Sequence, residues 1–246
     1  MISEIQRWQV LLDDQQPRDI LQWAARQFPG KIVLASALGP EAQILTHLIA
    51  RSRIDIPVFT IDTGRLFNET HDLIHRTNQT YHMKIKVFSP DALDVEDMVN
   101  AHGPNLFLEN RDLRKRCCVF RKVMPLQRAL APYETWITGM RREQSVTRAA
   151  ARVIDWDEQH QRIKLNPLVH WTADQIWDFI RSNNVPHSTL HEMGFPSIGC
   201  APCTRAVETG EDPRSGRWWW EEPEQRECGI HIIEGRIVRQ REPVTV

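Results

Sequence analysis

The chain has 246 residues, of which 41% are hydrophobic and 26% charged, and its formal net charge is -1. These values are ordinary for a globular protein with a sizeable core, and they exclude a general attraction to nucleic acid or to anionic membranes. No apolar run is long enough to span a bilayer, and the N-terminus lacks the basic start and apolar stretch of a signal peptide. We therefore expect a cytoplasmic protein that binds anions only through local groups of Lys and Arg.

Helical and strand patterns alternate through the first part of the chain. The predicted elements are, in order, a helix over 17–28, a strand over 31–36, a helix over 41–50, a strand over 57–62, a helix over 66–83, a strand over 84–88, helices over 91–102 and 118–130, and a strand over 134–138. Such alternation is typical of a mostly parallel α/β sheet, in which ligands bind beyond the carboxyl ends of the strands. The loops after Ser36, Asp62 and Gly139 are therefore candidate binding positions.

The pattern changes after about Leu168. A helix with a capping box is predicted over 172–182, and from Asn183 onward the sequence is rich in Pro, Gly, Cys, Arg and Trp with little periodicity. Unusual chemistry is therefore expected in this last part of the chain.

Four of the five cysteines form two close pairs, Cys117-Cys118 and Cys200 with Cys203. In a reducing compartment such pairs indicate metal or redox chemistry rather than disulfides, although free cysteines are also common core residues. Four thiolates suit either a tetrahedral zinc or an iron–sulfur cluster. The vicinal pair favours a [4Fe-4S] cluster, because neighbouring thiolates can bind different irons, but spacing alone does not exclude zinc.

The fifth cysteine, Cys228, stands alone near the C-terminus. Gly229 permits close approach of the chain, and His231 is near enough to assist a thiolate or to bind an anion. A thiolate is the reactive form of cysteine. From these residues two interpretations stay open, a nucleophile or a spectator close to a chain end.

Several basic and polar residues are candidates for an anion site. Arginines gather in three places, at Arg141, Arg142 and Arg148, at Arg205, and at Arg214 and Arg217. Guanidinium groups bind phosphate and sulfate well, although a charge run is more often a solvated face. The loop from Ser36 leads into a helix N-terminus that can bind phosphate, but it is neither a Walker loop nor a Rossmann fingerprint. Asp62 before Thr63-Gly64 is either a ribose ligand or part of an ordinary turn.

In combination, these motifs resemble the assimilatory adenylylsulfate/phosphoadenylylsulfate reductase family over nearly the whole chain. The matching segments are 61–66, 116–118 with 121–122, 138–145, 200–205, 211–220 and 227–231. The resemblance implies an adenine-nucleotide α-hydrolase-like (PP-loop-type) α/β fold, with a mostly parallel sheet flanked by helices. It also implies a nucleotide-binding domain over 1–205 and a mobile C-terminal tail over 206–246, which carries the catalytic cysteine in the same functional unit.

The resemblance implies a reaction as well, the reduction of adenylylsulfate to sulfite and AMP in assimilatory sulfate reduction, which supplies cysteine biosynthesis. Cys228 matches the nucleophile that forms an S-sulfocysteine, which thioredoxin or a glutaredoxin-like dithiol then resolves. The two cysteine pairs match the ligands of a [4Fe-4S] cluster. Lys122, Arg148, Arg214 and Arg217 match residues that hold the phosphosulfate, and Ser36, Asp62 and His231 complete the expected substrate-binding set.

Alternatives stay open at this point. The cysteine pairs favour adenylylsulfate, while the loose match of the loop over 36–43 leaves a phosphoadenylylsulfate reductase or a dual-substrate enzyme as the first alternative. A zinc-stabilised nucleotide-binding module without redox chemistry is the second. An enzyme that adenylates or thiolates its substrate with ATP is disfavoured, because the Ser-Gly-Gly-x-Asp-Ser loop of pyrophosphatases is absent. No nucleic-acid or membrane partner is expected, and the oligomeric state is open, a homo-oligomer included.

Overall fold

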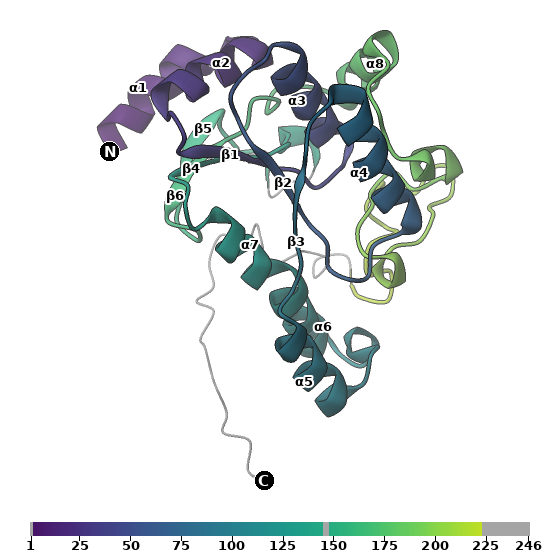
Figure 1. Cartoon of the computed structure of the whole chain (residues 1–246). Coiled ribbons are helices and arrows are strands. Elements are labelled where there is room, and N and C mark those ends of the chain that lie inside the picture. The colour runs from purple at the N-terminus through teal and green to yellow at the C-terminus, as the bar shows by residue number, and fades with distance from the viewer. Residues whose placement is uncertain (1, 145–147, 223–246) are drawn as a thin grey trace.

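The computed structural model describes residues 2–144 and 148–222, and it shows a six-stranded sheet with helices on both faces (Figure 1). The strands are β1 (Ile32–Ala35), β2 (Val58–Ile61), β3 (Lys86–Phe88), β4 (Thr135–Ile137), β5 (Ile154–Asp157) and β6 (Arg162–Leu165). Their order is β3-β2-β1-β4-β6-β5, and all neighbours are parallel except β5, which pairs antiparallel with β6. The chain runs from β1 outward to β3 and then returns to the other side of β1 with β4. The winding of the sheet therefore reverses between β1 and β4, where α/β sheets bind ligands.

The helices around the sheet begin at recognisable signals. They are α1 (Ile2–Leu12), α2 (Pro17–Gln27), α3 (Pro40–Arg51), α4 (Asn68–Tyr81), α5 (Ala92–His102), α6 (Arg111–Cys118), a π-helical segment (Val119–Val123), α7 (Met124–Leu130) and α8 (Ala173–Asn183). Short 3-10 turns lie at Leu106–Leu108, Arg142–Gln144, Thr189–Met193 and Ala201–Cys203. Prolines open α2 and α3, where the missing N–H costs nothing, and α8 begins with the predicted capping box of Thr172 and Gln175.

The sheet is buried on both faces, which explains the continuous apolar runs of its central strands. In β1, Ile32 and Leu34 belong to the larger core cluster, which includes residues of α1, α2, α3 and α8. Val33 points to the opposite face and packs with Leu126 and Leu130 of α7. The carboxyl end of this rigid strand therefore has a fixed position relative to both helix layers.

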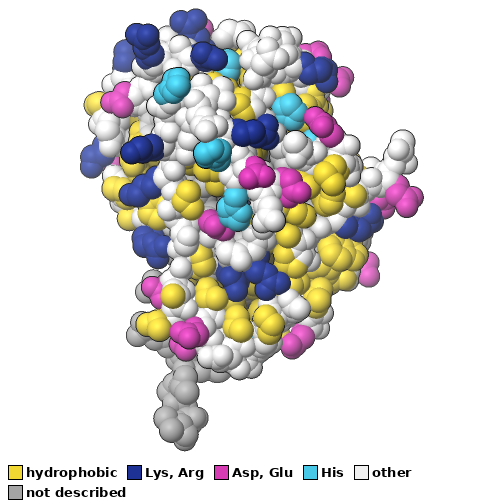
Figure 2. Space-filling view, turned by 45° about the vertical axis from the view of Figure 1, so that its right-hand side comes forward, with side chains coloured by type: hydrophobic (Ala, Val, Ile, Leu, Met, Phe, Trp, Pro, Cys, Tyr) yellow, Lys and Arg dark blue, Asp and Glu magenta, His cyan; other side chains and the backbone are white. Residues whose placement is uncertain are grey.

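The surface carries charges of both signs. On the face shown in Figure 2, Lys and Arg side chains are interspersed with Asp and Glu, in keeping with the net charge of -1. Apolar side chains gather in the right-hand half of the same view. Within the described residues, no helix combines the length and the apolar character that crossing a membrane requires.

The predicted fold class is confirmed, and three local predictions need correction. The helix predicted over 118–130 is part of a longer one that begins at Arg111, where the Asn110 side chain accepts a hydrogen bond from the Leu113 N–H. Its first turns, Arg111–Cys118, carry so many charges that no apolar period marks them. Helix α1 and the β5–β6 hairpin were not predicted; β5 is an edge strand with polar residues on one face, so its apolar pattern is weak.

Candidate active site at the carboxyl ends of the strands

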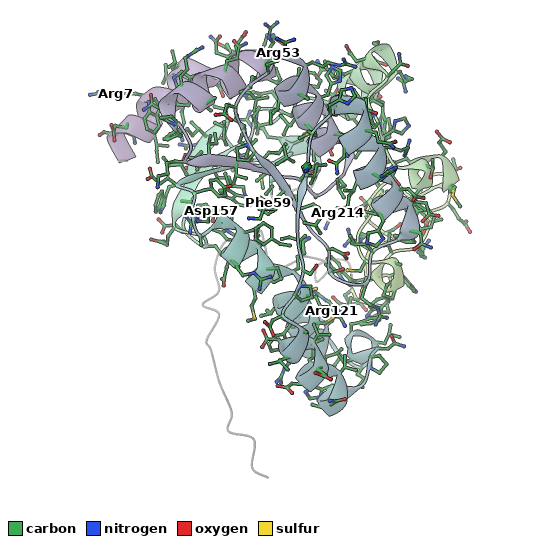
Figure 3. The ribbon with its side chains drawn as sticks, in the orientation of Figure 1. Arg7, Arg53, Phe59, Arg121, Asp157 and Arg214 are labelled. Carbon is green, nitrogen blue, oxygen red and sulfur yellow. The ribbon has the colours of Figure 1, made fainter. Side chains whose placement is uncertain are left out.

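A cavity of about 920 Å³ opens at the carboxyl ends of β1, β2 and β4. The loop after β1, the start of α3 and the segment after β4 form one side, and residues between 194 and 218 form the other. Figure 3 labels Phe59, Arg121 and Arg214, all of which line this cavity, whereas Asp157 lies at the far edge of the sheet. The cavity therefore occupies the position at which the winding of the sheet reverses.

The loop after β1 brings backbone N–H groups into the cavity. Ser36 is buried, and its hydroxyl accepts a hydrogen bond from the Leu38 N–H at 3.2 Å. Leu38 adopts a φ of 59°, a conformation that is costly for a branched side chain and that tends to occur at functional sites. Gly39 caps α3 without a side-chain hydrogen bond, so the first N–H groups of this helix remain available to a ligand.

Gly139 allows the end of β4 to pass close to α3. A Cβ atom at this position would lie 2.7 Å from the Cβ of Glu41 and 3.2 Å from the Ala42 nitrogen. Only glycine permits this approach, which closes the floor of the cavity between the two elements.

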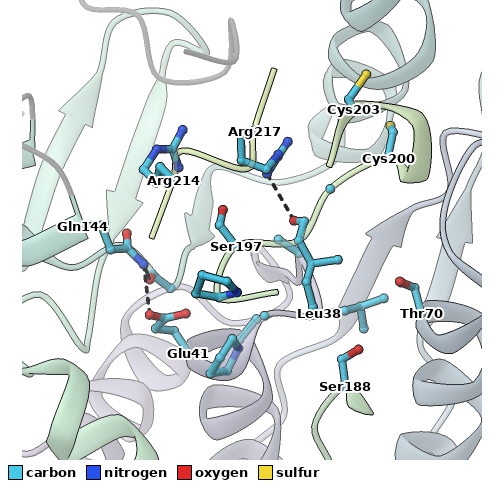
Figure 4. A pocket seen from close by; sticks show the side chains of 18 of the residues that line it. Leu38, Glu41, Thr70, Gln144, Ser188, Ser197, Cys200, Cys203, Arg214 and Arg217 are labelled. Atoms are coloured by element: carbon cyan, nitrogen blue, oxygen red, sulfur yellow. Dashed lines mark hydrogen bonds between the residues drawn. The ribbon is translucent and has the colours of Figure 1, made fainter. Parts of the chain in front are cut away.

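The structure brings together five of the seven predicted substrate-binding residues. The ones that line the cavity are Ser36, Lys122, Arg148, Arg214 and Arg217. Figure 4 shows Arg214 and Arg217 on one side of the cavity, with Glu41 and Gln144 on another. Arg217 donates to the carbonyl of Ile198 at 3.3 Å and passes so close to Gly199 that a Cβ there would overlap its guanidinium. His231 and Cys228 lie outside the described residues.

Asp62 does not line the cavity. Its carboxylate accepts a hydrogen bond from the Gly64 N–H at 2.8 Å, and its second oxygen lies 3.0 Å from the His71 ring. These are the contacts of an ordinary turn, which was the second interpretation of this residue.

Three of the clustered arginines interact with other protein groups. Arg141 forms an ion pair with Glu41 at 2.8 Å, although it also lines the cavity. Arg142 donates to the carbonyl of Ala151 at 2.8 Å. Arg205 binds Glu211 through two hydrogen bonds, of 3.0 and 2.8 Å. The sequence pattern grouped these three arginines with those that line the cavity, and it did not show which carboxylates and carbonyls they contact.

The four paired cysteines meet at one end of the cavity. Cys117 and Cys118 end α6 directly before the π-helical segment, a distortion that is frequent at functional sites. Cys200 and Cys203 flank a 3-10 turn from a distant part of the chain. All four line the cavity and pack with Phe107, Trp218 and Trp220.

The chemistry of this donor set fits a metal cofactor that binds thiolates. Burial raises the pKa of Cys117, although Arg121 nearby acts in the opposite direction, and burial together with Cys200 and Cys117 raises the pKa of Cys203 to about 12. The hydroxyl of Thr63 lies 3.2 Å from the Cys200 sulfur. Desolvated, mutually repelling thiolates need a cation, which a metal core provides. No three Cys, His, Asp or Glu side chains of the described residues are arranged around one metal ion, and a cluster does not need that arrangement because each iron takes its own thiolate.

The sequence did not reveal a buried ion pair behind the cysteines. Arg114 is 0% exposed, and its Nε and Nη2 donate to the two carboxylate oxygens of Glu221 at 2.8 and 2.7 Å. Its guanidinium lies 4.6 Å from the ring centroid of Trp218 and also hydrogen-bonds Cys118. Nothing in the sequence indicates that residues so far apart form an ion pair. The only sequence feature that pointed to Arg114 was its position close to Cys117 and Cys118.

The fold and the site define an α/β protein with a cavity at the strand ends that is lined by basic side chains and by four clustered cysteines. The family model "Phosphoadenosine phosphosulfate reductase domain" matches residues 31–206. The chain belongs to this phosphoadenosine phosphosulfate reductase family.

Relatives and solved structures agree with this assignment. The chain is 48% identical over 200 residues to the adenosine 5'-phosphosulfate reductase of Allochromatium vinosum, covering 81% of this chain and 78% of the relative. It is 47% identical over 202 residues to the enzyme of the same name from Burkholderia cepacia, covering 82% and 81% of the two chains. The crystal structure of phosphoadenylyl-sulfate reductase from Candida auris superimposes with a TM-score of 0.69 at 29% identity, over 82% of this chain and 96% of that one.

A more distant structure shares the fold alone. Candida glabrata FMN adenylyltransferase superimposes with a TM-score of 0.56 at 19% identity, over 99% of this chain and 79% of that one. This likeness concerns the arrangement of helices and strands, and it agrees with the predicted PP-loop-type fold.

Proposed function

We propose that the chain reduces adenylylsulfate to sulfite and AMP in assimilatory sulfate reduction. The observation that carries the proposal is one cavity at the strand ends in which Lys122, Arg148, Arg214 and Arg217 lie beside four cysteines. The cations suit the phosphosulfate end of the substrate, and the N-terminus of α3 suits its phosphate. The names of the bacterial relatives at 44–48% identity support the same substrate.

Cys228 is the proposed nucleophile. Its thiolate attacks the sulfur atom of adenylylsulfate, a sulfur–sulfur bond forms, and the bond from sulfur to the bridging oxygen breaks, so that AMP departs with the electron pair. The guanidinium groups and Lys122 stabilise the negative charge that develops on the departing phosphate. The product on the enzyme is an S-sulfocysteine.

A dithiol such as thioredoxin or a glutaredoxin-like protein completes the proposed cycle. One of its thiolates attacks the Cys228 sulfur, and sulfite leaves with the electron pair. Its second thiol resolves the mixed disulfide, so that the dithiol is oxidised by two electrons and Cys228 returns as a thiol. A reducing cytoplasm would sustain this cycle.

We infer that Cys117, Cys118, Cys200 and Cys203 hold a [4Fe-4S] cluster. When bound, the cluster would supply a metal core that tunes the electrostatics of the cavity that Lys122 also lines, while the electrons of the reduction come from thiols. The arginines around the thiols, Arg114, Arg121 and Arg217, offset the charge of the thiolates. We further propose that residues 1–205 bind the nucleotide and that 206–246 carry the nucleophile. The two parts form one functional unit, because Arg214 and Arg217 of the tail line the cavity and the Val207 N–H donates to the Gly194 carbonyl at 2.9 Å.

A second candidate substrate is the 3'-phosphorylated nucleotide, because the Candida auris structure is that of a phosphoadenylyl-sulfate reductase. Sulfite release is therefore to be measured with adenylylsulfate and with its 3'-phosphorylated form, each with a thioredoxin system. We expect faster turnover of adenylylsulfate. Preference for the phosphorylated form would reverse the assignment, and sulfite from neither would reject it.

Two further measurements test the mechanism. Incubation with adenylylsulfate and no reductant should add a sulfonate to the protein, visible in its intact mass and absent in Cys228→Ser. Anaerobically purified protein should contain iron rather than zinc and absorb at about 400 nm, and Cys203→Ser should lose the iron. Zinc in place of iron would instead favour the nucleotide-binding module without redox chemistry.

A further inference from the structure

The lining of the cavity includes carboxylates, among them that of Glu41, although the proposed ligand is an anion. Glu41 lies in the first turn of α3, with its side chain only 14% exposed. An unpaired carboxylate here would repel a phosphosulfate. A cation must therefore compensate the charge of Glu41, and its place in the cavity needs a functional explanation.

The partner is Arg141, at the end of β4. Its Nε donates to Glu41 Oε1 at 2.8 Å, and its side chain is only 10% exposed. Arg141 offsets the charge of Glu41, and its Nη1 also donates to Glu143 Oε2 at 3.2 Å. Because carboxylates already engage its guanidinium, Arg141 does not act as a further substrate cation. It also ties the first turn of α3 to the loop that follows β4.

The role becomes clear from the second hydrogen bond to the same oxygen. Gln144 Nε2 donates to Glu41 Oε1 at 3.0 Å, as the dashed line in Figure 4 shows. This contact fixes which end of the Gln144 amide faces Glu41, so its Oε1 points the other way. That oxygen accepts hydrogen bonds from the Arg141 backbone N–H at 3.2 Å and from Nη1 of Arg148.

We propose that Glu41 and Gln144 are positioning residues that act through Arg148. The proposal rests on the proposed function, in which Arg148 holds the phosphosulfate. A carboxylate cannot donate, so Gln144 must present its NH₂ group to Glu41 and its carbonyl to Arg148. The flexible guanidinium thereby has a defined acceptor on the cavity wall before substrate arrives, and less side-chain entropy is lost on binding.

We call this chain of hydrogen bonds from Glu41 through Gln144 to Arg148 the relay. It is to be tested with Gln144→Met, because methionine is close to glutamine in shape but lacks the polar atoms of the amide. Glu41 keeps its ion pair with Arg141 in this variant. Dissociation constants for adenylylsulfate and for adenosine are measured by calorimetry in a Cys228→Ser background, where transfer cannot proceed. We expect adenylylsulfate to bind about tenfold more weakly, since a hydrogen bond to a charged group is lost. Adenosine, which lacks the anionic end, should bind as before, and a merely structural defect would weaken both.

A double-mutant cycle with Arg148→Ala identifies the residue through which Gln144 acts. The double variant should bind adenylylsulfate no more weakly than Arg148→Ala alone. Effects that multiply, or unchanged binding in Gln144→Met, would overturn the relay. Glu41→Gln removes the carboxylate that orients the Gln144 amide, so this variant should also bind adenylylsulfate more weakly than the parent. Binding as tight as in the parent would count against the relay.

The same measurements separate this proposal from the function on which it rests. A parent protein that binds adenylylsulfate no more tightly than adenosine contradicts both. A parent that prefers adenylylsulfate, together with a Gln144→Met variant that keeps the whole preference, contradicts the relay alone.

Discussion

Arg114 and Glu221 form a buried, bidentate ion pair between α6 and the last described turn of the chain. Both side chains are nearly inaccessible, at 1% and 6% exposure, and Trp218 covers the guanidinium. The neighbouring charges of Glu221 and Cys118 raise the pKa of Arg114 despite its burial. The pair therefore fixes the segment that leads toward Cys228 to the helix that carries Cys117 and Cys118.

The first prediction concerns the stability that this pair provides. Glu221→Gln leaves a buried guanidinium without its counter-charge, and we expect the free energy of unfolding to fall by about 3 kcal/mol. The exposed pair of Arg205 and Glu211 has similar geometry, so Glu211→Gln is a matched control with a much smaller expected loss. Urea unfolding of the full chain measures both. Equal losses would show that burial of the first pair has no energetic consequence.

The second prediction concerns Gly199, which leaves room for the guanidinium of Arg217. Its backbone is not left-handed, so alanine introduces no strain there and only displaces the end of a flexible side chain. We expect Gly199→Ala to raise the KM for adenylylsulfate about tenfold, as loss of a cation–substrate hydrogen bond would, with stability nearly unchanged.

Gly139→Ala is the contrasting variant. Its Cβ would meet Glu41 and the backbone of Ala42 rather than a movable side-chain end. We expect it to lower the free energy of unfolding by about 1–3 kcal/mol. If Gly199→Ala destabilised the protein as much as Gly139→Ala, the absence of a side chain at Gly199 would be required for folding and not for the position of Arg217.

The sequence predicted the part of the fold that rests on local patterns. Apolar runs such as Ile32–Ala35 identified the central strands, and the residues after them marked the cavity, because parallel strands end at one edge of the sheet. The charged turns from Arg111 to Cys118 had no apolar period, so the true start of this helix could not be read. The edge strand β5 was missed because only one face of it is buried.

The sequence predicted which residue types line the candidate site, but it did not predict which residues form ion pairs and hydrogen bonds with one another. Arginines near 141–148 were recognised as a group, but only the fold shows that Arg141 faces a carboxylate 100 residues earlier in the chain. Asp62 carried two interpretations because a turn and a ligand have the same local sequence. Long-range pairs such as Glu41 with Arg141 depend on topology, which no single stretch of sequence encodes.

The last prediction concerns pH and a histidine remote from the cavity. Burial lowers the pKa of His47 below 6.5, and Arg51 adds to this effect; the ring packs edge-on against Phe179, and its Nδ1 lies 3.0 Å from the Tyr81 hydroxyl. The unfolded chain then binds a proton that the folded chain resists, so stability is present above the unfolded pKa and declines as pH falls below about 6.5. We expect the free energy of unfolding to decrease by at most about 1.4 kcal/mol per pH unit for this group. Burial also lowers the pKa of the half-buried His191, which adds to the same slope.

Urea unfolding at about pH 7.5 and about pH 5.5 measures this slope. His47→Gln should flatten it, because glutamine fills much of the space and does not titrate. His75→Gln is the matched control, since His75 lies on the exposed face of α4. An identical slope in wild type and His47→Gln would mean that His47 accepts its proton without opening the contact between α3, Tyr81 and Phe179. Flattening in His47→Gln alone would assign part of the acid sensitivity to this buried ring.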